Sequence, residues 1–196
     1  SEAVEIAKKY LTDWHQGSFS DNRANIINVD ARKFLESGVS QGSCDVIISD
    51  LTEPYEEGPS YMLFTKEFFE IIYSRLKDTG VFVLQSSILR IITYEMHRSI
   101  KTTIKEVFPI VRSYHTYVPS FDTMWSFILA SKTKDPLKLS KEYIDEYISE
   151  NVQGELKFYD GETHISLFNL SKDIRKILSE DGETITDSKP LFLKRK

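Results

Sequence analysis

An apolar run passes directly into an acidic loop at residues 44–59, where the chain reads Cys44-Asp45-Val46-Ile47-Ile48-Ser49-Asp50-Leu51-Thr52-Glu53-Pro54-Tyr55-Glu56-Glu57-Gly58-Pro59. The continuous apolar run after Gly42 is typical of a strand that other elements cover on both faces. We therefore predict a strand over 44–49 that lies centrally in a parallel sheet, with the acidic residues at its carboxyl end.

Helix and strand patterns alternate on both sides of this strand. The chain opens with an expected helix from Glu2 to about Trp14. We then predict a strand over 25–29, a helix over 31–37, a helix capped by Thr65 that runs to Leu76 and stops at Gly80, a strand over 81–85, a helix over 94–108, and two strands over 110–118 and 124–131. The short connection between the last two strands makes them antiparallel. This order predicts an open α/β sheet and not a barrel.

The character of the sequence changes after residue 135. We expect a charged helix over 140–151, an extended segment over 156–159, a helix over 170–178 and a polar, mobile tail over 180–188. The sequence therefore predicts two parts, residues 1–135 and residues 136–196, of which the second is a helical and extended extension.

Composition narrows the class of protein. The chain has 196 residues, 40% of them hydrophobic, and no apolar run approaches the ~20 residues of a membrane span. A single cysteine, Cys44, excludes an internal disulfide and favours the cytoplasm. The net charge of −5 argues against a nucleic-acid surface and for a cationic partner. The four histidines lack metal-ligand spacing, so we expect no metal site, and the chain has no G-x-G-x-x-G, Walker or G-x-S-x-G motif.

The acidic loop is the strongest candidate for chemistry. Asp50 follows a predicted strand at the edge where open α/β sheets bind their ligands. Crowded carboxylates hold protons more readily, so one can act as a base while others bind ammonium groups. A solvated acidic loop is the alternative, but Pro54 and Gly58-Pro59 favour a loop of defined shape.

Three further positions each have two interpretations. Asp30 follows a predicted strand and can accept a hydrogen bond from an adenine amino group, or it only caps the helix that begins at Ala31. Gln85 ends a strand and can reach the same crevice, or it is an exposed strand-end residue. Tyr159 begins a segment that ends at His164 and that by itself is only a turn.

Together these motifs resemble the polyamine aminopropyltransferases, the spermidine synthase family. The resemblance rests on residues 45–54 with Gly58-Pro59, Leu63-Phe64-Thr65-Lys66-Glu67-Phe68-Phe69, Asn28-Val29-Asp30-Ala31, Gln85, and Leu156-Lys157-Phe158-Tyr159 through His164. It covers residues 1 to about 180. Leu51 and the segments 56–59, 118–125 and 154–156 are more similar to thermospermine synthases than to spermidine synthases.

The resemblance implies both a fold and a reaction. The fold is the C-terminal portion of a Rossmann-like open sheet of the class I methyltransferase type, mostly parallel with an antiparallel closing hairpin. The reaction moves the aminopropyl group of decarboxylated S-adenosylmethionine, a co-substrate and not a prosthetic group, to a polyamine and releases methylthioadenosine. By resemblance, Asp50 takes the proton of the attacking amine, Glu53 holds an ammonium group, Gln85 and Tyr159 orient the acceptor, and Asp30, Ala31, Asp50 and Pro59 contact the nucleoside. Glu53 replaces the family's usual second aspartate.

The resemblance also implies that part of the family's chain is missing. Val4–Tyr10 matches the helix after the family's second strand, so we expect a small β-domain, two strands and a glycine-rich loop to be absent. We expect a separate polypeptide to complete the sheet, and a homo-oligomer. A methyltransferase that uses intact S-adenosylmethionine and a non-catalytic subunit remain alternatives, and the identity of the polyamine acceptor stays open.

Overall fold

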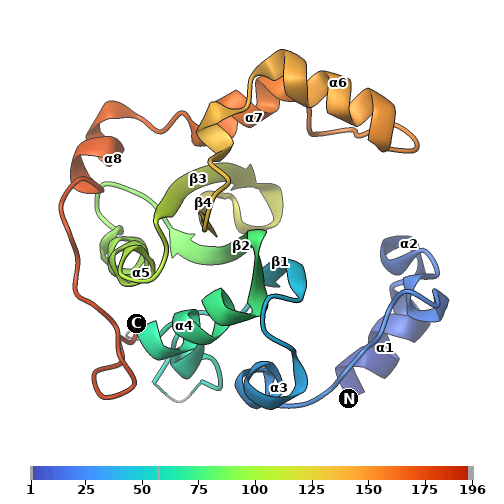
Figure 1. The fold of residues 1–196 in the computed structure, drawn as a ribbon, viewed down its shortest axis with the longest axis horizontal. Helices are drawn as coiled ribbons and strands as arrows, with labels where there is room; N and C mark the ends of the chain where they lie inside the picture. The colour runs from blue at the N-terminus through green and yellow to red at the C-terminus, as the bar shows by residue number, and fades with distance from the viewer. Residues whose placement is uncertain (1, 57, 194–196) are drawn as a thin grey trace. The chain divides into compact units, whose positions relative to one another are not determined.

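The structure is a computed structural model that describes residues 2–56 and 58–193 (Figure 1). The chain divides into two compact units, residues 1–38 and residues 39–196. None of the helices in the described ranges is long and apolar enough to cross a membrane.

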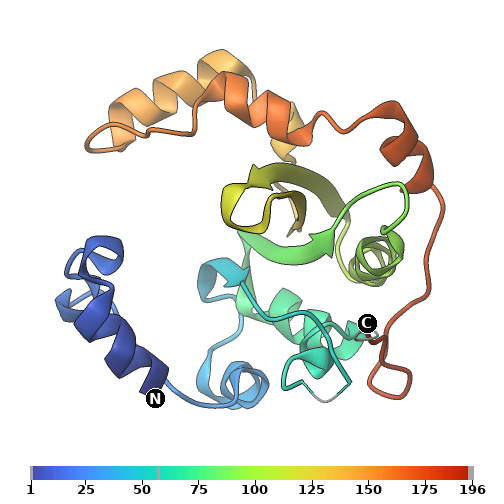
Figure 2. The same ribbon diagram turned by 180° about the vertical axis from the view of Figure 1, so that it is seen from behind.

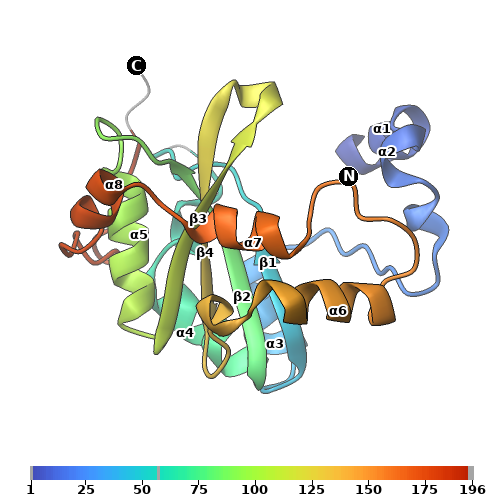
Figure 3. The same ribbon diagram turned by 90° about the horizontal axis from the view of Figure 1, so that it is seen from above.

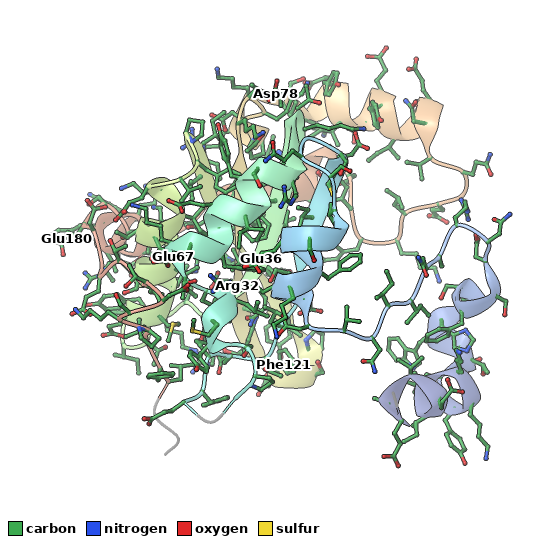
Figure 4. The ribbon with its side chains drawn as sticks, turned by 60° about the horizontal axis from the view of Figure 1, so that its bottom comes forward. Arg32, Glu36, Glu67, Asp78, Phe121 and Glu180 are labelled. Carbon is green, nitrogen blue, oxygen red and sulfur yellow. The ribbon has the colours of Figure 1, made fainter. Side chains whose placement is uncertain are left out.

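The first unit is helical. Its elements are α1 (Glu2–Tyr10), α2 (Thr12–His15), the short 3-10 helix η1 (Ser18–Ser20) and α3 (Ala31–Gly38). The helix expected up to Trp14 is interrupted at Leu11, where the backbone leaves the helical region (φ −110°, ψ 41°). On α3, Arg32 Nε lies 3.2 Å from Glu36 Oε1, and Figure 4 shows the two side chains next to each other.

The strand expected over 25–29 is absent, and this prediction was wrong. Its β-branched residues favour a strand, but a strand also needs a neighbour for its backbone hydrogen bonds. No described strand pairs with this run. Ile26, Ile27 and Val29 are therefore 46–60% exposed.

A four-stranded sheet in the order β1-β2-β4-β3 forms the framework of the second unit. β1 (Cys44–Ser49) pairs parallel with β2 (Leu76–Ile88), whereas β2 and β3 (Ile110–Val118) both pair antiparallel with β4 (Thr123–Ser131). The α/β class and the antiparallel closing hairpin are confirmed. The described sheet is mixed rather than mostly parallel, because the run over 25–29 forms no second parallel pairing.

β1 lies at an edge of the described sheet, so the prediction of a central strand was wrong. Only β2 flanks it among the described strands. As a consequence, Val46 is 57% and Ile48 is 72% exposed.

β2 begins earlier than expected. Thr65 caps α4 (Lys66–Arg75) as predicted, because its hydroxyl accepts a backbone N–H of the first turn at 3.4 Å. The helix ends before Leu76, which already pairs with Cys44 in the sheet. Gly80 is therefore an interior residue of β2 and not a helix stop. A Cβ at this position would lie 3.0 Å from the Cys44 carbonyl oxygen, so the close approach of the two strands favours glycine.

Helices cover both faces of the sheet (Figure 3). α4 and α5 (Glu95–Lys105) lie on one side, where the rings of Phe69, Phe82 and Phe108 pack together. α6 (Lys141–Asn151), which begins after its cap Ser140, and α7 (Gly161–Phe168) lie on the other side.

The C-terminal segment is packed against the helices. After α8 (Lys172–Ile177) the chain runs past α5 to α4 (Figure 2). Ile185 is 1% exposed, its N–H donates to Thr103 Oγ1 at 2.9 Å, and its carbonyl oxygen accepts from the Lys66 N–H at 2.8 Å. The prediction of a mobile tail over 180–188 was therefore wrong. The segment over 156–159, expected to be extended, is an irregular loop with bends at 157 and 158.

Candidate functional site

The acidic loop lies at the end of the sheet where β1 and β2 finish. Figure 4 shows Asp78, near the start of β2, and Phe121, in the β3–β4 turn, at opposite ends of the molecule's second unit. Antiparallel pairing of β2 with β4 places this turn beside the carboxyl end of β2. The acidic loop, Gln85 and the turn therefore share one end of the sheet, as the parallel pairing of β1 with β2 requires.

Short hydrogen bonds fix the course of the acidic loop. The Tyr55 N–H donates to the Glu53 carbonyl oxygen at 2.9 Å, which makes a γ-turn centred on Pro54. The hydroxyl of buried Ser60 lies 2.8 Å from the carbonyl oxygen of Thr52 and 3.2 Å from that of Glu53. The expected defined shape is confirmed for this part of the loop.

Neutral hydroxyl groups orient the Glu53 carboxylate. The Tyr55 hydroxyl donates to Oε2 at 3.1 Å, and the Ser87 hydroxyl donates to Oε1. In the part of the chain that the structure describes, no basic side chain pairs with Glu53. The half-buried Glu53 carboxylate is thus fixed in direction, and residues 2–56 and 58–193 supply no cationic counter-ion for it.

Glu53 lines a cavity of about 770 Å³. The other walls come from the end of β2, the start of α5 and the C-terminal segment, which is fastened to the loop where the Leu193 N–H donates to the Pro54 carbonyl oxygen at 3.0 Å. The lining residues are Glu53, Tyr55, Ser87, Ile88, Thr93, Glu95, Met96, Leu191, Phe192 and Leu193. Of these described residues two are acidic, none is basic and half are apolar, so the cavity favours a cationic ligand with an aliphatic body.

Gln85 fastens the acidic loop to the sheet. Its Nε2 donates to the Leu51 carbonyl oxygen at 2.7 Å, and its Oε1 accepts from the Trp125 indole N–H and the Ser87 N–H, both at 3.1 Å. The two N–H donors to Oε1 fix the orientation of the amide. Gln85 is only 5% exposed, so the interpretation as an exposed strand-end residue was wrong.

The other residues predicted for this site do not line the cavity. Asp50 is exposed at the end of β1, and neither Asp50 nor Pro59 is among the described lining residues. Asp30 and Ala31 belong to the first unit, where Asp30 Oδ1 accepts from the Lys33 N–H at 3.0 Å. The helix-cap interpretation of Asp30 is confirmed. Glu57 lies outside the described residues.

Tyr159 lies on the α7 side of the sheet. Its hydroxyl is 2.8 Å from Nδ1 of buried His164, whose Nε2 is 2.9 Å from the Pro136 carbonyl oxygen. Because a carbonyl only accepts, Nε2 carries the proton and the Tyr159 hydroxyl donates to Nδ1. Burial raises the pKa of Tyr159, which keeps this donor protonated.

A row of rings links Tyr159 to the face of the sheet that carries Gln85. The rings in contact are His164, Phe168, Tyr114 and Phe127, with centroids 5.0–5.1 Å apart. Phe127 is the β4 partner of Gln85, and paired residues of antiparallel strands share a face. Tyr159 and Gln85 therefore lie on the same side of the sheet, whereas no described contact joins Tyr159 to Glu53.

A buried histidine beneath the site was missed by the sequence analysis. His97 in α5 is 0% exposed, with Nδ1 2.8 Å from the hydroxyls of Ser86 and Ser126 and Nε2 2.8 Å from that of Ser113. Burial, with a smaller effect of the Lys101 charge, lowers the pKa of His97 to about 3. The available signal was a histidine on the apolar face of a predicted helix together with serines in predicted strands.

Known proteins are similar to this chain in sequence. Residues 1–142 match the family described as spermine/spermidine synthase domain. Polyamine aminopropyltransferase 2 of Hyperthermus butylicus is 40% identical over 192 residues, which cover 98% of this chain and 62% of that protein. The polyamine aminopropyltransferase of Sulfurisphaera tokodaii is 38% identical over 96% of this chain and 61% of its own. The chain thus spans about 62% of the length of these curated relatives.

Solved structures agree with the sequence comparison. A spermidine synthase in complex with the transition-state analogue AdoDATO has a TM-score of 0.77 and 33% identity, covering 90% of this chain and 57% of that one. Human methyltransferase-like protein 13 in complex with SAH, with a TM-score of 0.51 and 19% identity over 80% of this chain and 70% of its own, shares the fold alone. With most of its length matched by the family, the chain belongs to the spermine/spermidine synthase domain family.

Proposed function

We propose that this chain carries the acceptor side of an aminopropyltransferase, which moves the aminopropyl group of decarboxylated S-adenosylmethionine to a polyamine. The observation that carries the proposal is the Glu53 carboxylate, which is oriented by two hydroxyls on the wall of an acidic cavity and lacks an ion pair among the described residues. An ammonium group of the acceptor supplies the missing positive charge. Aliphatic walls suit the methylene chain of a polyamine.

The protein has to supply a base for this reaction, because the carbon beside the sulfonium of the co-substrate is already electrophilic. The acceptor amine attacks only after it loses a proton, because an ammonium group has no lone pair. The new C–N bond forms at the carbon beside the sulfonium, the C–S bond breaks, and its electron pair leaves with the neutral thioether methylthioadenosine. We assign the proton transfer to Asp50, whose exposed carboxylate follows β1 at the same end of the sheet.

The remaining predicted residues have supporting roles in this proposal. Gln85 holds the loop that carries both carboxylates, and Tyr159 orients the acceptor from the α7 side. We keep Asp30, Ala31, Asp50 and Pro59 as the nucleoside contacts that the family resemblance implies.

Finer features are also proposals. We propose thermospermine synthesis as the specific reaction, a cytoplasmic location, a homo-oligomer, and a separate polypeptide that completes the sheet beyond β1. Exposed Val46 and Ile48 on β1 support the last of these. The division into residues 1–135 and 136–196, with the second part contributing to the substrate site, also stays a prediction.

Asp50→Asn tests the proposed reaction, with Glu56→Gln as the matched control. Both variants remove one charge from the same loop, and Glu56 is also exposed. We expect Asp50→Asn to lower turnover by at least about 100-fold, the usual contribution of a positioned base. Binding of methylthioadenosine should change far less, and Glu56→Gln should keep both properties.

Product analysis distinguishes the alternatives. The chain is assayed alone and mixed with the N-terminal part of the Hyperthermus butylicus relative, with decarboxylated or intact S-adenosylmethionine and with putrescine, agmatine, spermidine or spermine. Methylthioadenosine as the product supports the proposal. Adenosylhomocysteine would identify a methyltransferase, and no product in any combination would favour a non-catalytic subunit.

A further inference from the structure

We propose that Ser126 and His97 are positioning residues for Glu53, which they reach through a bulge in β2. The proposal rests on the proposed function, in which Glu53 binds an ammonium group of the acceptor. Neither Ser126 nor His97 lines the cavity among the described residues. They act from beneath it, through hydrogen bonds to the Ser87 backbone, and the Ser87 side chain contacts the carboxylate.

The bulge lies at Ser86 and Ser87. The register of β2 against β4 shifts between Gln85 and Ile88, and Ser87 has a positive φ of 69°. A residue other than glycine in the left-handed backbone region is strained by roughly 1 kcal/mol or more, so surrounding contacts have to hold Ser87 in this conformation. The bulge also interrupts the regular backbone hydrogen bonds between β2 and β4. The carbonyl oxygens of Ser86 and Ser87 therefore need other hydrogen-bond donors.

Ser126 supplies that donor from β4. Its hydroxyl lies 2.7 Å from the Ser87 carbonyl oxygen and 3.2 Å from the Ser86 carbonyl oxygen, in a position that is 0% exposed. The shorter of these contacts takes the single hydroxyl hydrogen. Ser126 thus ties the strained residue to the interior of the sheet.

His97 fixes the direction of this hydroxyl. With the Ser126 hydrogen directed to Ser87, we assign the ring proton of His97 to Nδ1, which lies 2.8 Å from Oγ of both Ser126 and Ser86 and donates to these oxygens. Nε2 then accepts from the Ser113 hydroxyl at 2.8 Å. Because burial lowers the pKa of His97 to about 3, the ring keeps this neutral form throughout the physiological range.

The series of contacts that begins at His97 ends at the wall of the cavity, on the Glu53 carboxylate. With its carbonyl held below, Ser87 directs its hydroxyl to Glu53 Oε1, while Tyr55 holds Oε2 at 3.1 Å. Loss of the Ser126 bond releases the bulge, and the carboxylate loses one of its two described hydroxyl donors.

Ser126→Ala tests the proposal, with Ser113→Ala as the matched control. Both substitutions remove a buried hydroxyl that contacts His97, so both lower the free energy of unfolding, but only Ser126 contacts Ser87. Two readouts are compared: the NMR chemical shift of the Glu53 carboxyl carbon, and the Kd for spermidine by calorimetry. We expect Ser126→Ala to move the shift and to raise the Kd on the order of tenfold, since hydrogen bonds to charged groups have about that effect.

A double-mutant cycle with Glu53→Gln decides whether the effect passes through Glu53. In the Glu53→Gln background, Ser126→Ala should change the Kd by less than about twofold, because the group it positions is already altered. Equal effects of Ser113→Ala and Ser126→Ala on the Glu53 shift, or an undiminished effect of Ser126→Ala on the Kd in the Glu53→Gln background, would overturn the proposal. If the unsubstituted chain binds no spermidine, the proposed function is contradicted, and the carboxyl shift alone decides the positioning role.

Discussion

Gln85→Glu replaces the amide nitrogen of the side chain that fastens the acidic loop to the sheet with an oxygen. The wild-type Nε2 donates to the Leu51 carbonyl oxygen at 2.7 Å, and the substitution puts a carboxyl oxygen in its place. The other oxygen continues to accept from Trp125 and Ser87. An ionised carboxylate would place one of its oxygens against the Leu51 carbonyl oxygen, and both atoms can only accept hydrogen bonds. A protonated carboxyl instead donates its O–H to the Leu51 carbonyl oxygen and restores the bond.

The stability lost in this variant depends on pH. An unfolded glutamate has a pKa of about 4.3, and burial beside a carbonyl raises the pKa of the introduced carboxyl to about 6 by analogy with other buried acids. A pKa that is raised on folding means that stability is retained below pH 4.3 and is lost as the pH rises toward 6. Each pH unit in this window removes about 1.4 kcal/mol from the free energy of unfolding, so the loss at pH 7 is about 2 kcal/mol.

Urea denaturation at pH 4 and pH 7 measures this dependence. The free energy of unfolding of Gln85→Glu should be close to that of the wild type at pH 4 and lower by about 2 kcal/mol at pH 7. Gln85→Met is the control, because it removes the hydrogen bonds of the side chain without adding a titrating group, and its loss of about 1–3 kcal/mol should be the same at both values. An equal loss for Gln85→Glu at both pH values would refute the placement of this side chain against Leu51.

Three other substitutions test the framework. Thr65→Ala removes the cap of α4 and should lower the free energy of unfolding by about 1 kcal/mol in urea denaturation. Gly161→Ala would push a Cβ into the backbone of α6 at Lys141, so a loss of about 1–3 kcal/mol should appear as a lower Tm. The hydrogen bond from Arg112 lowers the pKa of Asp135, so this carboxylate stabilises the fold above the unfolded pKa of about 3.9 and stops doing so as the pH falls through the folded value. Asp135→Asn should therefore lose stability at pH 7, by less than about 1 kcal/mol because the pair is partly exposed, and lose less at pH 3 in the same assay.

Elements with local signals could be predicted from the sequence. Thr65 and Ser140 cap α4 and α6 as their side chains suggest, because capping depends only on backbone N–H groups within the next turn. The paired strands 110–118 and 123–131 follow from β-branched and aromatic runs on either side of a turn with Pro119. In these cases the deciding interactions join residues that are close in sequence.

Elements that depend on distant partners were harder to predict. Leu76 has the spacing of a helix residue, but pairing with Cys44 assigns it to β2. Ile185 lies in a polar segment typical of a mobile tail, yet its backbone bonds Thr103 and Lys66 on two different helices. Both outcomes come from tertiary contacts that override local preference.

The candidate site combines both situations. Acidic residues such as Glu53 are visible in the sequence because four carboxylates between turn-forming residues are unusual, whereas Ser87 is one of many serines. Strict alternation along β2 would place Ser87 on the face of Gln85, away from α5. The bulge, which the register shift reveals, instead brings Ser87 to the cavity beside α5, in reach of Glu53. A bulge without glycine leaves no sequence signal, because the contacts that hold it come from another strand. The sequence therefore predicts the negative charge of this site but not the direction in which the Glu53 carboxylate is held.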